Sequence, residues 1–252
     1  MLQYYTRKLS ENSMKRTIFY LCIAIFVALI IQPNLNTQDP VDKRVPSNSQ
    51  ESAKTNENAN IQQAKSKATI CIDAGNGGDD LGYSIDGYIP EKDINLQISL
   101  QLGSILKQMG YNVVYTRTDD NVTAYANEDD SHKERLSIAK NLKADYLISI
   151  QLNSDEDPLN LGYSIFTQQN DTMIQLANQI DTNLEAINYS QFKGLDSDHY
   201  SNFAILNDPE MTTIMIELGY ITNADDYAKL TDESFQSKIA KAIADAFLTE
   251  IN

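Results

Sequence analysis

The feature that most constrains the fold is a regular alternation, between residues 67 and 252, of short apolar runs with longer stretches of helical period. The apolar runs have the length of β-strands, and in the stretches between them apolar residues recur every three or four positions. The strand-like runs occupy 68–73, 112–116, 146–150, 163–166, 203–206 and 214–216. This alternation predicts an α/β fold with a mostly parallel, twisted sheet of about six strands and helices on both faces.

Four of the intervening stretches are predicted to be helices. They cover 91–109, 131–142, 173–187 and a final stretch that starts near residue 231. Gly110 follows the first of them, where glycine commonly closes a helix. The second opens with the motif SHKE, in which Ser131 and Glu134 have the spacing of a capping box.

The N-terminus has the pattern of a membrane-targeting segment. Residues 1–16 contain four Lys and Arg, and fourteen apolar residues follow at 18–31. Basic residues before an apolar run favour a cytoplasmic N-terminus. The run is short for a spanning helix, but no small-x-small cleavage pattern follows it, so we favour an uncleaved signal-anchor at 17–32 over a cleaved signal peptide. The anchor predicts a single-pass protein of the cell membrane, and both alternatives place the rest of the chain on the extracytoplasmic side.

By composition, the rest of the chain divides into a polar linker and an acidic domain. Residues 33–66 are rich in Asn, Gln, Ser, Lys and Pro, bury too little surface to offset ordering entropy, and are predicted to form a flexible extracytoplasmic linker. The predicted domain at 67–252 contains twelve Lys and Arg against thirty Asp and Glu, a net charge of −18, which argues against nucleic acid as a partner.

The two cysteines of the chain, Cys22 and Cys71, form no Cys-x-x-Cys pattern, so neither a disulfide framework nor a thiolate zinc site is indicated.

Polar residues stand where several of the predicted strands end. Asn76 follows the first strand, Gln151 ends the third, and Glu217 ends the last. Glu91 opens the first helix after a glycine-rich loop. Because ligands of open α/β sheets bind outside the carboxyl ends of the strands, we expect these four side chains to converge in one crevice.

Five segments match, in order and at suitable spacing, the motifs of a known family. They read IDAGNGGDDLG at 72–82, EKDINL at 91–96, GYNVVYTR at 110–117, ADYLISIQLNS at 144–154 and ELGYITN at 217–223. Through them, nearly all of 69–250 resembles the zinc-dependent N-acetylmuramoyl-L-alanine amidases, which cut the bond between muramic acid and the peptide stem of peptidoglycan. The resemblance implies an amidase-like fold and a site of action at the cell wall.

The resemblance also implies roles for single positions, and two of these positions are altered. In the family, the histidine after Asp-Ala-Gly and the histidine after Ser-Ile are zinc ligands, and here these positions hold Asn76 and Gln151. Glu91 keeps the position of the remaining ligand, and Glu217 keeps that of the catalytic acid/base.

Other matched positions have both a functional and a purely structural interpretation. Gly77, Gly78, Asp80 and Asn153 are implied to line the loop or the substrate. Alternatively, the glycines only permit a tight turn and Asp80 only braces it. His132 and His199 do not fall at motif positions, and we expect ordinary surface or loop histidines.

The altered positions change the metal chemistry that the site can support. Zinc favours imidazole nitrogen, whereas amide oxygens such as those of Asn76 and Gln151 suit hard cations such as calcium and magnesium. We therefore predict weak or absent zinc binding, no cofactor, and a Glu217 that is retained but vestigial. Without zinc, Glu217 would have to activate bare water, whose pKa is about 15.7.

These observations lead to one preferred hypothesis and three alternatives. The preferred one is a membrane-anchored, catalytically inactive amidase-like domain that binds peptidoglycan or a cell-wall protein, or regulates an active amidase. The main alternative is an active peptidoglycan amidase with a non-standard metal site, which uses either another metal or a histidine supplied from elsewhere in the chain, for which His199 is the candidate. A metal-free glycosidase would use Glu91 and Glu217 as its carboxylate pair. The last alternative is an anchored scaffold whose crevice has no role.

Overall fold

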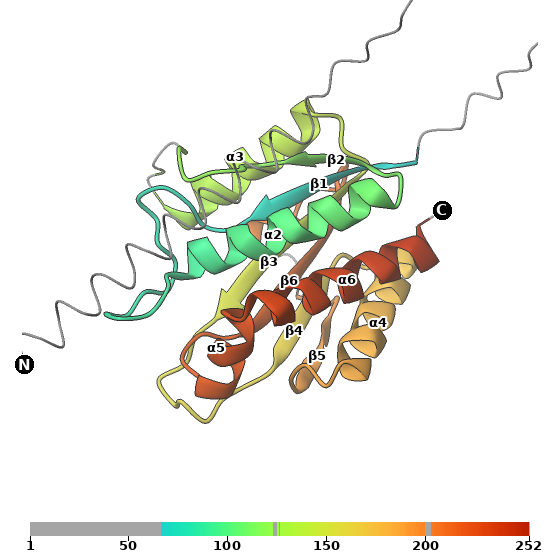
Figure 1. Cartoon of the computed structure of the whole chain (residues 1–252). Coiled ribbons are helices and arrows are strands. Elements are labelled where there is room, and N and C mark those ends of the chain that lie inside the picture. The colour runs from blue at the N-terminus through green and yellow to red at the C-terminus, as the bar shows by residue number, and fades with distance from the viewer. Residues whose placement is uncertain (1–66, 123–124, 126, 200–202, 252) are drawn as a thin grey trace, which may run out of the picture. The chain divides into compact units, whose positions relative to one another are not determined.

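The computed structural model describes residues 67–251, apart from 123–124, 126 and 200–202 (Figure 1). The predicted N-terminal segment, signal-anchor and linker, at 1–16, 17–32 and 33–66, lie outside the described residues. Among the residues that are described, no helix is long and apolar enough to cross a membrane.

A single six-stranded sheet forms the centre of the domain, with the strand order β2-β1-β3-β6-β4-β5 (Figure 1). The strands are β1 (Thr69–Ala74), β2 (Asn112–Tyr115), β3 (Tyr146–Asn153), β4 (Tyr163–Thr167), β5 (Phe192–Asp196) and β6 (Thr212–Tyr220). β3 and β6 are the longest strands and lie side by side at the middle of the sheet. The prediction of an α/β fold with about six strands is confirmed.

The prediction of a mostly parallel sheet is wrong, because the sheet is mixed. β2, β1, β3 and β6 are parallel to one another, but β4 pairs antiparallel with β6, and β5 is parallel to β4. The cause is the connection at 154–162, which contains no helix. A parallel neighbour requires a crossover, usually a helix, whereas a loop lets the chain reverse its direction.

Helices cover both faces of the sheet, as predicted. They are α2 (Glu91–Gln108), α3 (Glu128–Asn141), α4 (Asp171–Ala186), α5 (Ala224–Leu230) and α6 (Glu233–Glu250). α6 lies between α2 and α4, and these three helices pack on one face over the larger core (Figure 1). α3 and the 3-10 helix η2 (Ala204–Leu206) cover the other face over a smaller core.

Several predicted boundaries differ from the structure. α3 starts three residues before the predicted capping box, because Asn127 is its N-cap and accepts a hydrogen bond from the backbone N of Asp130. Ser131 is therefore a buried residue of the first turns rather than a cap. The predicted strand at 203–206 is the 3-10 helix η2, whose Ile205 and Leu206 fill the smaller core. Sequence patterns indicated neither β5 nor the seven-residue α5.

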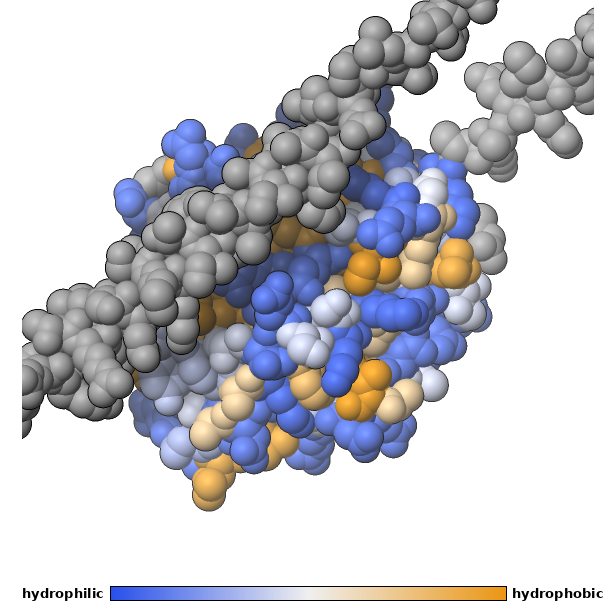
Figure 2. Space-filling model, viewed as in Figure 1, coloured by the Kyte–Doolittle hydropathy of each residue, from blue (hydrophilic) through white to orange (hydrophobic). Residues whose placement is uncertain are grey.

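The surface on the side of α2 and α6 is mainly hydrophilic, with single hydrophobic residues scattered over it (Figure 2). Isolated exposed apolar residues are normal on a soluble domain.

Candidate functional site

The candidate site lies at the carboxyl ends of β1 and β3, between the start of α2 and the polar side chains that the strands present on the α3 face. Side chains alternate between the two faces of a strand. In β3, Ile148 and Ile150 point into the larger core, so Ser149 and Gln151 point to the α3 face. Gln151 is in register with Glu217 of β6, so the two side chains lie next to each other on that face.

A buried network of hydrogen bonds, centred on Asp73, lies next to the candidate site. Asp73, which is fully buried, accepts hydrogen bonds from Arg135 (Nη1 to Oδ2, 2.8 Å), Ser149 (Oγ to Oδ2, 2.7 Å) and Thr116 (Oγ1 to Oδ1, 2.8 Å). Arg135 is itself 5% exposed and forms an ion pair with Asp73. Both oxygens of Asp73 are thus engaged, which makes this residue a brace for the loop that follows β1.

The glycine-rich loop after β1 brings two of the predicted residues together. Gly77 and Asp80 form an isolated antiparallel bridge, closed by two backbone hydrogen bonds of 3.0 and 3.1 Å. Gly82 has a φ of +62°, and a Cβ atom at this residue would lie 2.5 Å from Oδ1 of Asn76 and 2.6 Å from Oε2 of Glu91. The missing side chain of Gly82 therefore allows Asn76 and Glu91 to approach each other.

Glu91 ties three elements together at the start of α2. Its Oε2 accepts a hydrogen bond from the backbone N of Tyr83 (2.9 Å), and its Oε1 accepts from the backbone N of Leu152 in β3 (2.9 Å). Asn95, one turn later in α2, donates to Oε1 of Glu91 (3.3 Å) and to the backbone O of Gly75 (2.6 Å). Burial raises the pKa of Glu91, and the hydrogen bonds from Tyr83 and Leu152 oppose that rise.

The two amide residues are placed against this loop. Asn76 donates from Nδ2 to Oδ2 of Asp80 (3.1 Å), while its Oδ1 is buried and has no hydrogen-bond partner among the described residues. Gln151 is 9% exposed and donates from Nε2 to Oγ of Ser149 (3.3 Å). Its amide lies over Gly75, because a Cβ atom there would come within 2.0 Å of Nε2 and 2.3 Å of Oε1.

Glu217 lies on the same side and interacts electrostatically with Glu91. Asn153 donates from Nδ2 to Oε2 of Glu217 (2.7 Å). Burial raises the pKa of Glu217 to about 7, the hydrogen bond from Asn153 lowers it, and the nearby charge of Glu91 raises it further. A carboxyl group with this pKa can exchange a proton near neutral pH. The structure thus places Asn76, Glu91, Gln151 and Glu217 near one another beyond the carboxyl ends of β1 and β3.

Comparison with known proteins identifies the scaffold. The model of the N-acetylmuramoyl-L-alanine amidase family (Amidase_3) matches residues 70–249, well over half of the chain. The chain belongs to this amidase family.

Relatives of the amidase family align over the same region. The chain is 33% identical to YqiI of Bacillus subtilis (strain 168) over 69% of this chain and 81% of that protein. It is 31% identical to N-acetylmuramoyl-L-alanine amidase LytC of the same organism over 70% of this chain, but it spans only 34% of LytC. The chain therefore shares a domain with LytC rather than its whole length.

Solved amidase structures have the same fold. The catalytic domain of CwlV, an N-acetylmuramoyl-L-alanine amidase from Bacillus (Paenibacillus) polymyxa var. colistinus, aligns with a TM-score of 0.63 and 31% identity over 73% of this chain and 99% of that one. The CwlD amidase from Clostridioides difficile, solved in complex with the GerS lipoprotein, aligns with a TM-score of 0.63 and 29% identity over 73% and 98%. The described domain is therefore a cell-wall amidase-like domain.

Zinc, the metal of this amidase family, does not fit the residues at the site. Glu91 is the one family-type ligand, and its neighbours Asn76 and Gln151 offer amide groups instead of imidazole nitrogen. In the part of the chain that the structure describes, no group of three or more His, Cys, Asp or Glu side chains is arranged to hold a metal ion.

Neither histidine joins the amidase site, but one of them is not an ordinary surface residue. His132 is 5% exposed within α3, and burial followed by the charge of Arg135 lowers its pKa to about 4. The expectation of a surface or loop position is therefore wrong for His132. His199 is exposed and contacts Asp196 at the end of β5 (Nδ1 to Oδ2, 3.0 Å). Because β5 runs opposite to β6, His199 lies toward the end of the sheet remote from Glu217.

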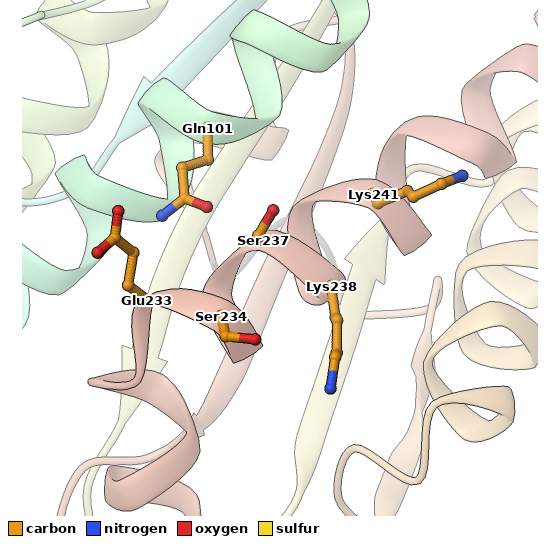
Figure 3. A pocket seen from close by; sticks show the side chains of 6 residues that line it. All are labelled: Gln101, Glu233, Ser234, Ser237, Lys238 and Lys241. Carbon is orange, nitrogen blue, oxygen red and sulfur yellow. The ribbon is translucent and has the colours of Figure 1, made fainter.

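A wide groove between α2 and α6, of about 560 Å³, is separate from the amidase site (Figure 3). Its lining residues are Gln101, Glu233, Ser234, Ser237, Lys238 and Lys241. Figure 3 shows that Lys238 and Lys241 point away from Gln101 and Glu233, so the charged groups do not converge. The groove lies on the larger-core face of the sheet and adds nothing to the crevice of Glu91 and Glu217.

Asn95 and Arg135 are parts of the site that sequence reasoning missed. Asn95 had a detectable signal, because it follows Glu91 by four residues on a predicted helix and so shares its face. Arg135 had none, because its contact with Asp73 depends on how α3 packs on the sheet.

Proposed function

We propose that this protein is a membrane-anchored amidase-like domain that has lost hydrolytic activity and binds peptidoglycan or a cell-wall protein, or regulates an active amidase. The observation that carries the proposal is the combination of a complete amidase scaffold with amides at positions 76 and 151. In this arrangement, residues 1–16 are cytoplasmic, 17–32 anchor the chain, 33–66 form a linker, and the domain faces the cell wall.

Loss of activity follows from the chemistry of the remaining groups. Glu217 is placed to take up a proton, and its raised pKa suits that role. However, a carboxylate alone must act on bare water with a pKa of about 15.7, whereas a zinc-bound water has a pKa near 7. Cleavage of an amide bond at a useful rate is therefore not expected.

Binding is supported by what the crevice still offers. The amides of Asn76 and Gln151 can each donate and accept, as an amide-rich peptide stem requires. The glycine-rich loop, the brace at Asp73 and the carboxylate of Glu91 keep the crevice in shape. Binding of a protein partner is supported by the amidase CwlD, which was solved in complex with a lipoprotein.

A sedimentation and release assay tests the proposal. The full chain is mixed with purified peptidoglycan, and both bound protein and released stem peptide are measured. We expect the protein to sediment with peptidoglycan and to release no peptide. The matched variant Asn76→His/Gln151→His, given zinc, is expected to gain zinc binding and to provide the comparison for release. Release by the wild-type chain would show that it is an active hydrolase, and failure to sediment would rule out peptidoglycan as its ligand.

One observation favours a second candidate, an active hydrolase with an oxygen-ligated metal. Oδ1 of Asn76 is buried, unpartnered among the described residues, and close to Glu91. An enzyme of this kind would release stem peptides in an assay that a chelator inhibits and that Glu217→Ala abolishes. Release that is insensitive to chelators would exclude it.

A further inference from the structure

A small cavity lies beside the glycine-rich loop, next to the residues that follow β2 and the first turns of α3. Its lining includes Asn76 and Gly77 of the loop, together with Tyr125, Ser131 and Arg135. The cavity has a volume of about 30 Å³, which is enough for a water-sized group or ion and too small for an organic ligand. We call it the loop cavity.

Arg135 brings an unpaired hydrogen-bond donor to the loop cavity. The residue is 5% exposed, and its Nη1 donates to Oδ2 of Asp73 at 2.8 Å. Its Nε is buried and has no acceptor among the described residues. A buried N–H group without an acceptor is costly, and the cost is greater when the group is charged. Because Arg135 lines the loop cavity, an acceptor in that cavity can complete its hydrogen bonds.

The other charged residue that lines the loop cavity is also positive. It is Arg117, and no carboxylate is among the described side chains of the lining. Arg117 is 6% exposed and donates to three neutral backbone oxygens, those of Ala74, Lys92 and Asp119. Its Nη1 is 3.9 Å from Oδ1 of Asp120, a side chain that is 43% exposed to solvent. Two buried guanidinium groups therefore meet at the cavity, and only one of them has a buried counter-ion.

The positive charge extends beyond the ion pair of Arg135 with Asp73. Burial first, and the charge of Arg135 second, lower the pKa of His132 to about 4, whereas the opposing effect of Asp73 is smaller. A water molecule in the loop cavity would accept from Nε but add no negative charge. An anion supplies both the acceptor and the charge, and hydrogen bonds between ionised partners are the stronger ones.

We propose that the loop cavity binds one small monovalent anion of the size of chloride, with Nε of Arg135 as its charged donor. The hydroxyl groups of Ser131 and Tyr125 line the same cavity and can donate to the anion. Because Asn76 and Gly77 are also part of the lining, the bound anion supports the glycine-rich loop of the candidate site. This role is independent of catalysis and of any metal.

Thermal unfolding of the full chain tests the site when sodium chloride replaces sodium gluconate at constant ionic strength. Gluconate is too large for the cavity, and the constant ionic strength removes the general effect of salt on an acidic domain. With a Kd of about 30 mM, about 150 mM chloride favours folding about sixfold, which raises Tm by about 2–4 °C. Chloride NMR gives a second readout, because exchange with a site on the protein broadens the chloride line.

Two variants remove the site in different ways. Arg135→Lys keeps a positive charge beside Asp73 but removes Nε, and Ser131→Val fills part of the cavity without touching the ion pair. Each should lose the chloride-dependent rise in Tm and at least nine-tenths of the line broadening. Lys133→Gln, which removes an exposed positive charge on α3, is the matched control and should keep both. The NMR readout applies to any variant that is folded, whatever its stability.

Three results would overturn the inference. The first is a wild-type chain whose Tm and chloride line width are the same in chloride and in gluconate, which would mean that the cavity holds only water. The second is a chloride effect that survives both Arg135→Lys and Ser131→Val. The third is a chloride effect that Lys133→Gln reduces as much as Arg135→Lys does, which would place the anion on the surface of α3.

Discussion

At the scale of single residues, His132 gives the clearest link between burial and stability. Its imidazole is enclosed in α3 beside Arg135, which disfavours the protonated form and lowers the pKa from 6.5 to about 4. Above pH 6.5 the side chain is neutral in both the folded and the unfolded chain. As the pH falls from 6.5 toward 4, the unfolded chain binds the proton more readily, so this group withdraws stability from the fold.

We therefore predict that His132→Gln reduces the acid sensitivity of the domain. Between pH 7 and pH 4, the free energy of unfolding of the wild type should fall by about 3 kcal/mol more than that of the variant. This figure follows because a shift of one pKa unit corresponds to about 1.36 kcal/mol. Urea unfolding at both pH values measures the difference. His199→Gln, which removes an exposed imidazole, is the matched control. A difference between His132→Gln and wild type that stays constant with pH would contradict the prediction.

At the scale of elements, the short helix α5 depends on a cap that also holds a loop. Oδ1 of Asn223 accepts hydrogen bonds from the backbone N atoms of Asp225 (3.0 Å) and Asp226 (3.2 Å). Its Nδ2 donates to the backbone O of Pro158 (2.7 Å), in the loop between β3 and β4. One side chain therefore caps α5 and fixes the connection that makes the sheet mixed.

Asn223→Ala should lower the free energy of unfolding by about 2–3 kcal/mol, of which about 1 kcal/mol is the lost cap and the rest the unpaired Pro158 carbonyl. The comparison is Asn170→Ala, because Asn170 caps α4 through its Oδ1 in the same way. That variant should lose only about 1 kcal/mol. Urea unfolding of both variants measures this contrast, and equal losses would show that the bond to Pro158 contributes nothing.

The elements also show how far a sequence of this kind can be interpreted. The long helices α2 and α4 and the apolar strands were predicted, because amphipathic period and burial agree along them. β5 (FKGLD) has no alternating apolar pattern, and α5, with seven residues, is too short to show a helical period. Neither element could therefore be predicted from the sequence. The prediction of a mostly parallel sheet missed the antiparallel β4, although residues 154–162 have no helical period that would suggest a crossover helix.

The same limits hold at the candidate site. The positions of Asn76, Gln151 and Glu217 beside strand ends follow from the sequence, and the structure places all three near Glu91. The unpaired oxygen of Asn76 and the packing of Gln151 over Gly75 did not follow. They depend on contacts between segments far apart in the chain, which no local pattern records.

At the scale of the whole molecule, the dominant property is negative charge. Residues 67–252 contain twelve Lys and Arg against thirty Asp and Glu, and a net charge this far from zero destabilises a compact state through self-repulsion. We predict that raising sodium chloride from about 10 mM to about 200 mM, which shortens the Debye length from about 30 Å to below 10 Å, stabilises the domain by roughly 1 kcal/mol. Urea unfolding at each salt concentration measures this. Asp79→Asn/Glu156→Gln, at two exposed positions, should show a smaller gain, and a loss of stability with salt would contradict the prediction.

The three-way bracing by Glu91 has a consequence for how such chains evolve. Its carboxylate receives backbone N–H groups from Tyr83 and Leu152 and thereby joins a loop, a helix and a strand. Selection for a folded domain alone is then enough to retain a glutamate at this position, whatever the protein does. The presence of Glu91 therefore says little about catalysis, whereas the side chains at 76 and 151 can change the chemistry of the site without removing these two backbone contacts.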